Sequence, residues 1–187
     1  MKEKIQFLRE GIRNLKTVGT ITRSSRFLCA KVVSLSNLSG SKCIVELGAG
    51  DGVMTTHILD VMPRDAKLFA FEINPHFCDK LRSIKDPRLY VIEDSAENLA
   101  KHLSDHGFSQ IDTVFSALPF VMLPDDVSNS IVESCHRYLK PLGQYLQIHY
   151  SLLEKGLYKK IFGHVDVTFH LLNIPPAFIL ACSKGAL

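Results

Sequence analysis

The pattern of apolar and polar positions changes near residue 40 of this chain. In the first segment the apolar positions are Ile5, Leu8, Ile12 and Leu15. Their spacing of three and four predicts an amphipathic helix over residues 3–16. A second helix is expected to start at Ser24 and Ser25, where a hydroxyl can cap the first turn, and to run to about Leu38. Residues 1–38 therefore predict an N-terminal helical lead-in.

From residue 42 onward, short apolar runs alternate with longer segments of helical character. Strands are expected at residues 43–47, 68–71, 89–92 and 111–115, with helices near 53–60, 75–84, 96–104 and 125–139. This alternation predicts right-handed βαβ units and a mostly parallel sheet with helices on both faces. The final elements expected are strands near 144–150, 165–171 and 177–182 and a helix near 152–160.

The last two predicted strands are close enough in sequence to form an antiparallel hairpin. Together with the five before them they make a seven-stranded α/β sheet. We find no internal repeat and no linker, so we expect a single domain over residues 1–187, with its core from residue 42 to residue 187.

Composition excludes several classes of protein. The chain is 46% hydrophobic and 22% charged, which is too apolar for a disordered protein. Its five cysteines show no C-x-x-C pair and no zinc-like spacing, so we expect neither structural disulfides nor a metal site. The N-terminus lacks the apolar run of a signal peptide, and the longest uncharged stretch is too short and too interrupted to span a bilayer. We therefore expect a cytoplasmic protein.

Charge is distributed unevenly along the chain. The formal net charge is +3, yet residues 1–40 hold eight bases and only two acids. The predicted helix over residues 3–16 has two interpretations. As a core element, it covers the active-site mouth with its apolar stripe, and its bases form the solvated face. As an interfacial helix, it lies on an anionic bilayer with that stripe in lipid and its bases near the head groups.

A glycine-rich turn follows the first predicted strand, in the sequence Glu46-Leu47-Gly48-Ala49-Gly50-Asp51-Gly52. Glycines allow the backbone to approach a ligand, and the N-terminus of the next helix offers free N–H groups. An ordinary tight turn needs one glycine rather than three at alternate positions. A dinucleotide fingerprint would need glycine at position 53, where the chain has Val53.

The acid two residues before the first glycine, together with the third glycine, resembles the loop of class I S-adenosylmethionine-dependent methyltransferases, which share a Rossmann-like fold. The resemblance implies S-adenosylmethionine as cofactor, and Glu72 at the end of the second strand as the acceptor for its ribose hydroxyls. It places Asp94 beside the adenine amine. The full set of implied cofactor residues is Glu46, Gly48, Gly50, Gly52, Glu72, Ile73, Asp94, Ser95, Ala96, Ser116, Thr20 and Ser24.

For two of these acids the sequence leaves open a structural role in place of cofactor binding. Glu72 is also explained as a surface residue at a strand end. Asp94 is also explained as a helix N-cap with Glu97 three residues later, and this capping role does not exclude contact with adenine.

Several short motifs resemble, in order, those of bacterial phospholipid N-methyltransferases. They are Phe7-Leu8-Arg9, Lys16 to Thr20, Ser24-Ser25-Arg26, Ser116-x-Leu118-Pro119, Gln147-Ile148-His149-Tyr150 and Asn173-Ile174-Pro175-Pro176-Ala177. That family converts phosphatidylethanolamine to phosphatidylcholine, and a related group methylates ornithine lipids. The implied substrate contacts are Phe7, Leu118, Pro119, Phe120, Tyr150 and Asn173. This chain departs from the pattern at His149, where we expect a small hydroxyl residue.

The chemistry of amine methylation sets a requirement on the site. A primary amine with a pKa of about 10.4 is protonated at neutral pH, and presenting its free base costs on the order of 4 kcal/mol. Tyr150, His149 and Asn173 are the candidates to accept the proton, and Tyr150 and Phe120 could face a quaternary product. The alternative explanation for His149 and Tyr150 is packing or a satisfied hydrogen bond, and the alternative for Asn173 is a turn.

Two further functions compete with a lipid methyltransferase that lies on the inner face of an anionic membrane. An rRNA adenine N6-methyltransferase shares the core and a Leu-Pro-aromatic motif. Against it, Ser116 replaces the amide of that motif, and no chain is left for an RNA-binding domain, so we do not expect a nucleic-acid partner. A catalytically inactive membrane-binding module conflicts with the intact glycines and acids. The oligomeric state stays open.

Overall fold

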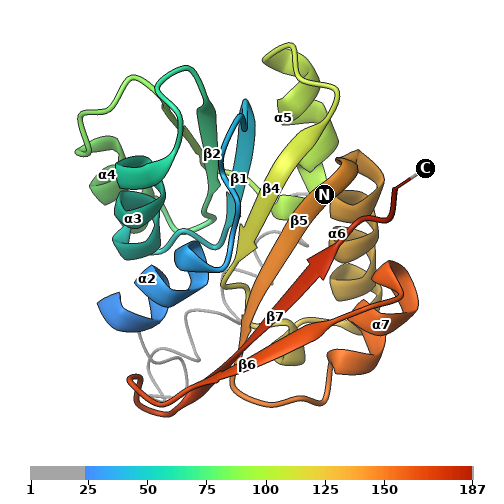
Figure 1. Cartoon of the computed structure of the whole chain (residues 1–187). Coiled ribbons are helices and arrows are strands. Elements are labelled where there is room, and N and C mark those ends of the chain that lie inside the picture. The colour runs from blue at the N-terminus through green and yellow to red at the C-terminus, as the bar shows by residue number, and fades with distance from the viewer. Residues whose placement is uncertain (1–23, 187) are drawn as a thin grey trace.

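The computed structural model describes residues 24–186 and has a seven-stranded sheet at its centre (Figure 1). The strand order is β3-β2-β1-β4-β5-β7-β6. Neighbours from β3 to β5 are parallel, while β7 pairs antiparallel with both β5 and β6. The strands are β1 (Cys43–Leu47), β2 (Lys67–Phe71), β3 (Leu89–Ile92), β4 (Ile111–Ser116), β5 (Leu139–His149), β6 (Asp166–His170) and β7 (Ala177–Ser183). The predicted Rossmann-like sheet with a C-terminal hairpin is confirmed.

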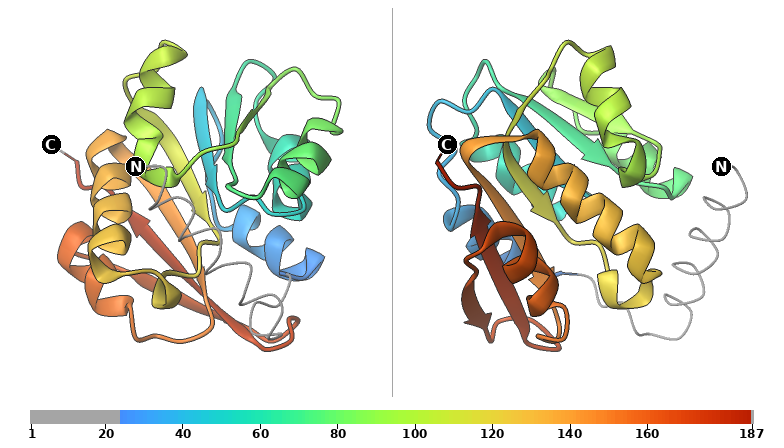
Figure 2. Two further views of the ribbon diagram at one scale, coloured as in Figure 1. Left: turned by 180° about the vertical axis from the view of Figure 1, so that it is seen from behind. Right: turned by 90° about the vertical axis from the view of Figure 1, so that its right-hand side faces the viewer.

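Helices cover both faces of the sheet, as Figure 2 shows from behind and from the side. The first group, α2, α3 and α4, lies on one face, and α5, α6 and α7 lie on the other. The helices are α2 (Arg26–Ser34), α3 (Val53–Val61), α4 (Pro75–Arg82), α5 (Leu99–Asp105), α6 (Asp125–Tyr138) and α7 (Lys155–Phe162). Two 3-10 turns, η1 (Ala96–Asn98) and η2 (Phe120–Met122), follow β3 and β4.

The central strand β1 is apolar at every position except Glu46, and its place in the sheet explains this pattern. All five of its residues are buried. Ile44 belongs to the core under α2 and α3, and Val45 belongs to the core under α5 and α6. A strand that packs helices on both faces has no solvent side, so the alternation typical of a half-exposed strand is absent.

The second predicted helix forms, but it is shorter than expected. Its N-cap is Ser25, whose side chain accepts a hydrogen bond from the Leu28 backbone N–H. The helix ends at Ser34 rather than at about Leu38. The helix predicted over residues 3–16 lies outside the described residues.

The fifth strand is longer than its prediction. It begins at Leu139 instead of residue 144, because an irregularity in its pairing with β4 lets the chain pass Pro141 and Gly143 without leaving the sheet. Leu142 has a positive φ of 63° there. Tyr150, predicted as the last residue of this strand, lies just beyond it. Within residues 24–186, no helix has the length and hydropathy needed to cross a membrane.

Candidate functional site

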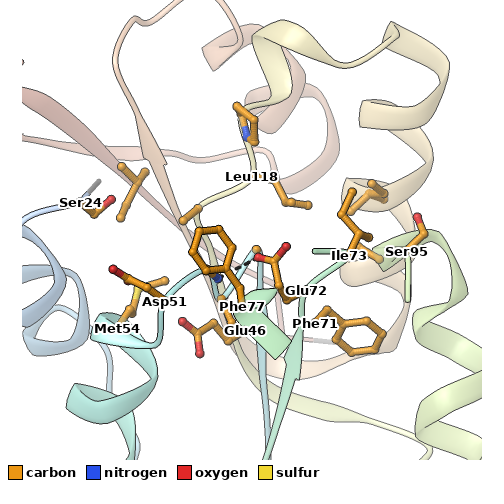
Figure 3. Close-up of a pocket in the computed structure, with 18 of the residues that line it drawn as sticks. Ser24, Glu46, Asp51, Met54, Phe71, Glu72, Ile73, Phe77, Ser95 and Leu118 are labelled. Carbon is orange, nitrogen blue, oxygen red and sulfur yellow. Dashed lines mark hydrogen bonds between the residues drawn. The ribbon is translucent and has the colours of Figure 1, made fainter. Parts of the chain in front are cut away.

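A cavity of about 440 Å³ opens at the carboxyl ends of β1, β2 and β4 (Figure 3). Parallel α/β sheets bind ligands at this edge, where the loops after neighbouring strands converge. The predicted cofactor residues that line it are Ser24, Glu46, Gly48, Gly50, Glu72, Ile73, Asp94, Ser95 and Ala96. The predicted substrate residues Leu118 and Pro119 line it as well. The sequence motifs therefore meet around one cavity although up to 95 residues separate them.

The turn between β1 and α3 forms one wall of this cavity. The backbone N–H groups of Gly48 and Ala49 both donate to the Phe71 carbonyl, at 2.9 and 3.1 Å, which fixes the turn against the end of β2. Gly48 has a φ of +74°, and a Cβ atom there would lie 3.0 Å from the Leu118 Cδ2 atom. A glycine is needed at this position for both its backbone conformation and its lack of side chain.

Glu72 connects the glycine-rich turn to the loop after β2. Its Oε2 accepts a hydrogen bond from the Gly50 N–H at 2.8 Å, and its Oε1 accepts one from the Asn74 N–H at 2.8 Å. The residue is 9% exposed, and Figure 3 shows its carboxylate between Phe77 and Leu118. A carboxylate has about four acceptor positions, so two backbone donors leave capacity for ligand hydroxyls.

Glu46 contributes a second carboxyl group to the cavity. Its Oε2 accepts a hydrogen bond from the Thr55 hydroxyl at 2.6 Å, while its buried Oε1 has no hydrogen-bond partner within residues 24–186. Burial raises the pKa of Glu46 to about 8; the Thr55 hydrogen bond opposes this shift, and the charges of Glu72 and Asp51 add to it. A buried unpaired oxygen at a cavity wall fits a ligand that carries a donor or a positive charge.

Asp94 is held in its charged form at the end of β3. Burial favours the neutral acid, but hydrogen bonds from His102, Asn98 and the Ser95 backbone outweigh it and hold the pKa of Asp94 below its ordinary value. The His102 Nε2 atom lies 2.8 Å from the Asp94 Oδ2 atom.

The N-cap of the following 3-10 turn is Ser95, whose side chain accepts from the Glu97 N–H. The interpretation of Asp94 as N-cap is therefore wrong by one residue. The chain turns after Ser95, so Asp94 remains at the cavity wall.

The loop after β4 supplies the apolar side of the cavity. Leu118 and Pro119 line it, together with side chains from α6 and its approach. The Leu118 carbonyl accepts from the Gln147 Nε2 at 3.0 Å and from the Phe120 N–H at 3.0 Å. Ser116 and Phe120, both predicted at the site, are instead buried beneath it and are not among the residues that line the cavity. The apolar residues lining this side are Ala117, Leu118, Pro119, Leu123, Val127, Ile131 and Ile148.

The three predicted proton acceptors do not line the described cavity. His149 is 4% exposed, its Nε2 lies 2.9 Å from the Tyr158 hydroxyl, and burial lowers the pKa of His149 to about 4. Asn173 is 3% exposed, and its amide spans two segments: Oδ1 accepts from the Ser25 N–H and Nδ2 donates to the Pro175 carbonyl, each at 2.7 Å. Tyr150 is partly exposed beyond the end of β5.

Some residues of the cavity were not predicted, and some predicted residues cannot be placed. Asp51, Met54 and Phe77 line the cavity from the turn and from α3 and α4. Asp51 lies within the glycine motif and could have been found there, whereas no spacing rule points to Phe77. Gly52, a predicted cofactor residue, does not line the cavity; it is the N-cap of α3 and has a φ of +87°. Phe7 and Thr20 lie outside the described residues.

Comparison with known proteins connects this geometry to a family. A model of the methyltransferase domain family matches residues 44–143. Ornithine lipid N-methyltransferase of Singulisphaera acidiphila is 27% identical over 185 residues, which cover 97% of this chain and 96% of that protein.

Solved structures share the fold at lower identity. A 16S rRNA methyltransferase from T. thermophilus, in complex with AdoMet and guanosine, has a TM-score of 0.64 and 17% identity over 88% of this chain and 44% of its own. Magnesium protoporphyrin IX methyltransferase from Synechocystis with bound SAM has a TM-score of 0.63 and 13% identity over 97% of this chain and 84% of its own.

Proposed function

The chain belongs to the methyltransferase domain family, and we propose that it methylates the amine head group of a membrane lipid. It is a class I methyltransferase whose cofactor is S-adenosylmethionine. The observation that carries the lipid substrate is the similarity to ornithine lipid N-methyltransferase, because it extends over 97% of this chain rather than over the cofactor-binding core alone. Ornithine lipid and phosphatidylethanolamine are the two head groups we consider.

The cavity fits the cofactor in its donors and acceptors. When bound, S-adenosylmethionine supplies a methyl group on a positively charged sulfur. We assign its cationic portion to the side of Glu46, where a buried carboxyl oxygen lacks a partner among the described residues. Glu72 would accept from the ribose hydroxyls, and Asp94, Ser95 and Ala96 would contact the adenine. Gly48 and Gly50 allow the backbone to approach this ligand.

The substrate amine would enter on the apolar side of the cavity. A neutral amine is required for attack, and desolvation by Leu118, Pro119 and Leu123 lowers the pKa of an amine placed beside them. Gln147 keeps this wall in position, because its Nε2 donates to the Leu118 carbonyl while its Oε1 accepts from the Tyr145 hydroxyl. The protein thus lowers the cost of the free base and aligns the amine for transfer.

We choose among the three candidate proton acceptors by their burial and hydrogen bonds. His149 and Asn173 are buried and already bonded to other residues, so we assign them to holding the loops around the site. Tyr150 is 40% exposed beside the end of β5, and we retain it as the candidate that contacts the substrate amine.

The experiment is methyl transfer to defined vesicles. The full chain is incubated with S-adenosylmethionine and vesicles that contain either ornithine lipid or phosphatidylethanolamine, and lipid products are identified by mass spectrometry. We expect N-methylated lipid with at least one of the two, and none with the Glu72→Ala variant. If neither lipid gains methyl groups while rRNA under the same conditions does, the proposal is wrong.

A further inference from the structure

Seven exposed apolar side chains gather near the carboxyl-end edge of the sheet, and we call them the apolar rim. They are Phe27, Leu152, Leu153, Phe169, Leu171, Leu172 and Ile174. Leu153 and Ile174 are 83% and 85% exposed, so they project from the surface instead of packing on it. Single exposed apolar residues are common, but a group on adjacent loops marks an interaction site.

Strand pairing brings the main parts of the rim together. His149 at the end of β5 pairs with Phe178 near the start of β7, and His170 at the end of β6 pairs with Ala177. The β5–α7 connection, which carries Leu152 and Leu153, and the β6–β7 connection therefore leave the sheet at one edge. Figure 1 shows both connections along the lower edge of the molecule.

The rim is continuous with the mouth of the cavity. The Ser25 hydroxyl donates to the Leu172 carbonyl at 2.6 Å, and the Ser25 N–H donates to Asn173. These bonds fix the β6–β7 connection against the start of α2, where the neighbouring residue Ser24 lines the cavity. On the other side Ile148, which also lines the cavity, immediately precedes the end of β5.

We propose that the apolar rim is the surface by which this protein docks on a phospholipid bilayer, with its projecting leucines and isoleucine inserted among the head groups. This inference rests on the proposed function, since a lipid amine is anchored by its acyl chains and the cavity mouth must reach the bilayer surface. It does not depend on residues 3–16, because every rim residue belongs to the described part of the chain.

Shape and charge favour a bilayer over a folded partner. The rim side chains come from two separate loops, a helix start and, for Phe169, the edge strand β6. Such a scattered set suits a fluid medium better than a matching rigid surface. Basic groups flank them: the Arg26 guanidinium lies 4.9 Å from the centre of the Phe27 ring, and exposed Lys155 follows Leu153 by two residues. Glu154 between them is half-buried. Apolar tips beside cationic heads match the boundary between acyl chains and anionic head groups.

The test compares two double variants of the full chain. Leu153→Glu with Ile174→Glu places charges on the rim. Val61→Glu with Leu142→Glu makes the same kind of change at residues that are 60% and 70% exposed, at the end of α3 and near the start of β5, on the opposite edge of the sheet. Circular dichroism checks that both fold. Binding to vesicles of phosphatidylethanolamine and phosphatidylglycerol is measured by co-sedimentation.

We expect the rim variant to partition into vesicles at least about tenfold less than wild type, and the control variant to bind like wild type. The rim variant should still methylate a short-chain, water-soluble amine lipid. Equal vesicle binding by the rim variant and wild type overturns the docking proposal. A second outcome also overturns it: the wild type is a dimer, and the rim substitutions dissociate the dimer without changing vesicle binding. The rim is then a contact between two copies of the chain.

The two proposals fail in distinguishable ways. If the protein binds vesicles through the rim but methylates no lipid, the proposed function is wrong and the docking surface stands. If vesicle lipids are methylated equally by wild type and the rim variant, the function stands and the docking surface is wrong.

Discussion

The two sides of the cavity use polar side chains in opposite ways. At the ends of β1, β2 and β3, the carboxyl groups of Glu46, Glu72 and Asp94 face the cavity. His149 at the end of β5 and Asn173 in the β6–β7 connection are buried, and their polar atoms bond to other parts of the protein. The side that we propose for the cofactor therefore presents carboxyl groups to a ligand. The side that we propose for the substrate uses its polar groups internally and exposes apolar ones.

Sheet topology explains this difference. On the cofactor side, parallel strands end at one edge and the residues that follow them meet over that edge. On the proposed substrate side, β7 runs antiparallel beside β5. Helix α7 packs on the sheet face that also carries α5 and α6, and the His149 side chain contacts Tyr158 of α7 rather than the cavity. Strand-end acids after β2 and β3 and near the end of β1 thus line the cavity, whereas Ser116 at the end of β4 is buried although both neighbouring strands are parallel to it. Parallel neighbours bring a strand end to the site, but packing decides whether its side chain reaches the cavity.

Removing Glu72 should cause the largest change. The Glu72→Ala variant loses the acceptor for the N–H groups of Gly50 and Asn74 as well as the proposed ribose contacts. We expect S-adenosylmethionine affinity to fall about 100-fold, since hydrogen bonds to a charged group contribute about 1.5–3 kcal/mol each. Isothermal titration calorimetry measures this, with Glu133→Ala as the control, an exposed acid on α6 that does not line the cavity. Unchanged affinity in Glu72→Ala would refute its ribose role.

The buried His149 should make stability depend on pH. Its pKa is lowered from 6.5 to about 4 by burial, so the unfolded chain binds a proton that the folded protein does not. The free energy of unfolding therefore carries no penalty from His149 above pH 6.5. As the pH falls from 6.5 toward 4, this free energy decreases by about 3 kcal/mol in total.

Urea denaturation of His149→Gln across this range should show a flatter pH profile than wild type. Tyr158→Phe, which removes the hydrogen bond but leaves the histidine buried, should keep the wild-type slope. If stability depends on pH equally in His149→Gln and in wild type, His149 is not buried in its neutral form. The contrast between a side with polar groups facing the cavity and a side with polar groups buried would then be wrong.

Asn173 offers a smaller test of the same contrast. Asn173→Ala removes the hydrogen bonds to the Ser25 N–H and the Pro175 carbonyl, and we expect a loss of about 2 kcal/mol in unfolding free energy. Asn173→Asp keeps the acceptor for Ser25 and should lose less. A variant with full stability but strongly reduced kcat would instead assign Asn173 to the chemistry.

The sequence predicted the fold well because its signals were local. Apolar runs such as Cys43–Leu47 and the cap at Ser25 depend on neighbouring residues, and both are found as expected. The start of β5 was missed, because Pro141 and Gly143 argue locally against a strand that its pairing with β4 nevertheless extends.

The site was predictable to the extent that it follows strand ends in the parallel region. Glu46, Glu72 and Asp94 line the cavity as the motif placed them. Phe77 was missed because it reaches the cavity from a helix, and the burial of His149 and Asn173 depends on contacts with Tyr158 and Ser25 that are distant in sequence or in a different element. Such contacts are set by tertiary packing, which no local pattern records.

The most direct test of a lipid amine as substrate is a competition in one mixture. It holds wild-type protein, methyl-labelled S-adenosylmethionine, vesicles with ornithine lipid and phosphatidylethanolamine, rRNA, and free ornithine. After separation of the fractions, we predict that the label is found in the lipid. Label found mainly in the RNA or in the free amine would contradict the account.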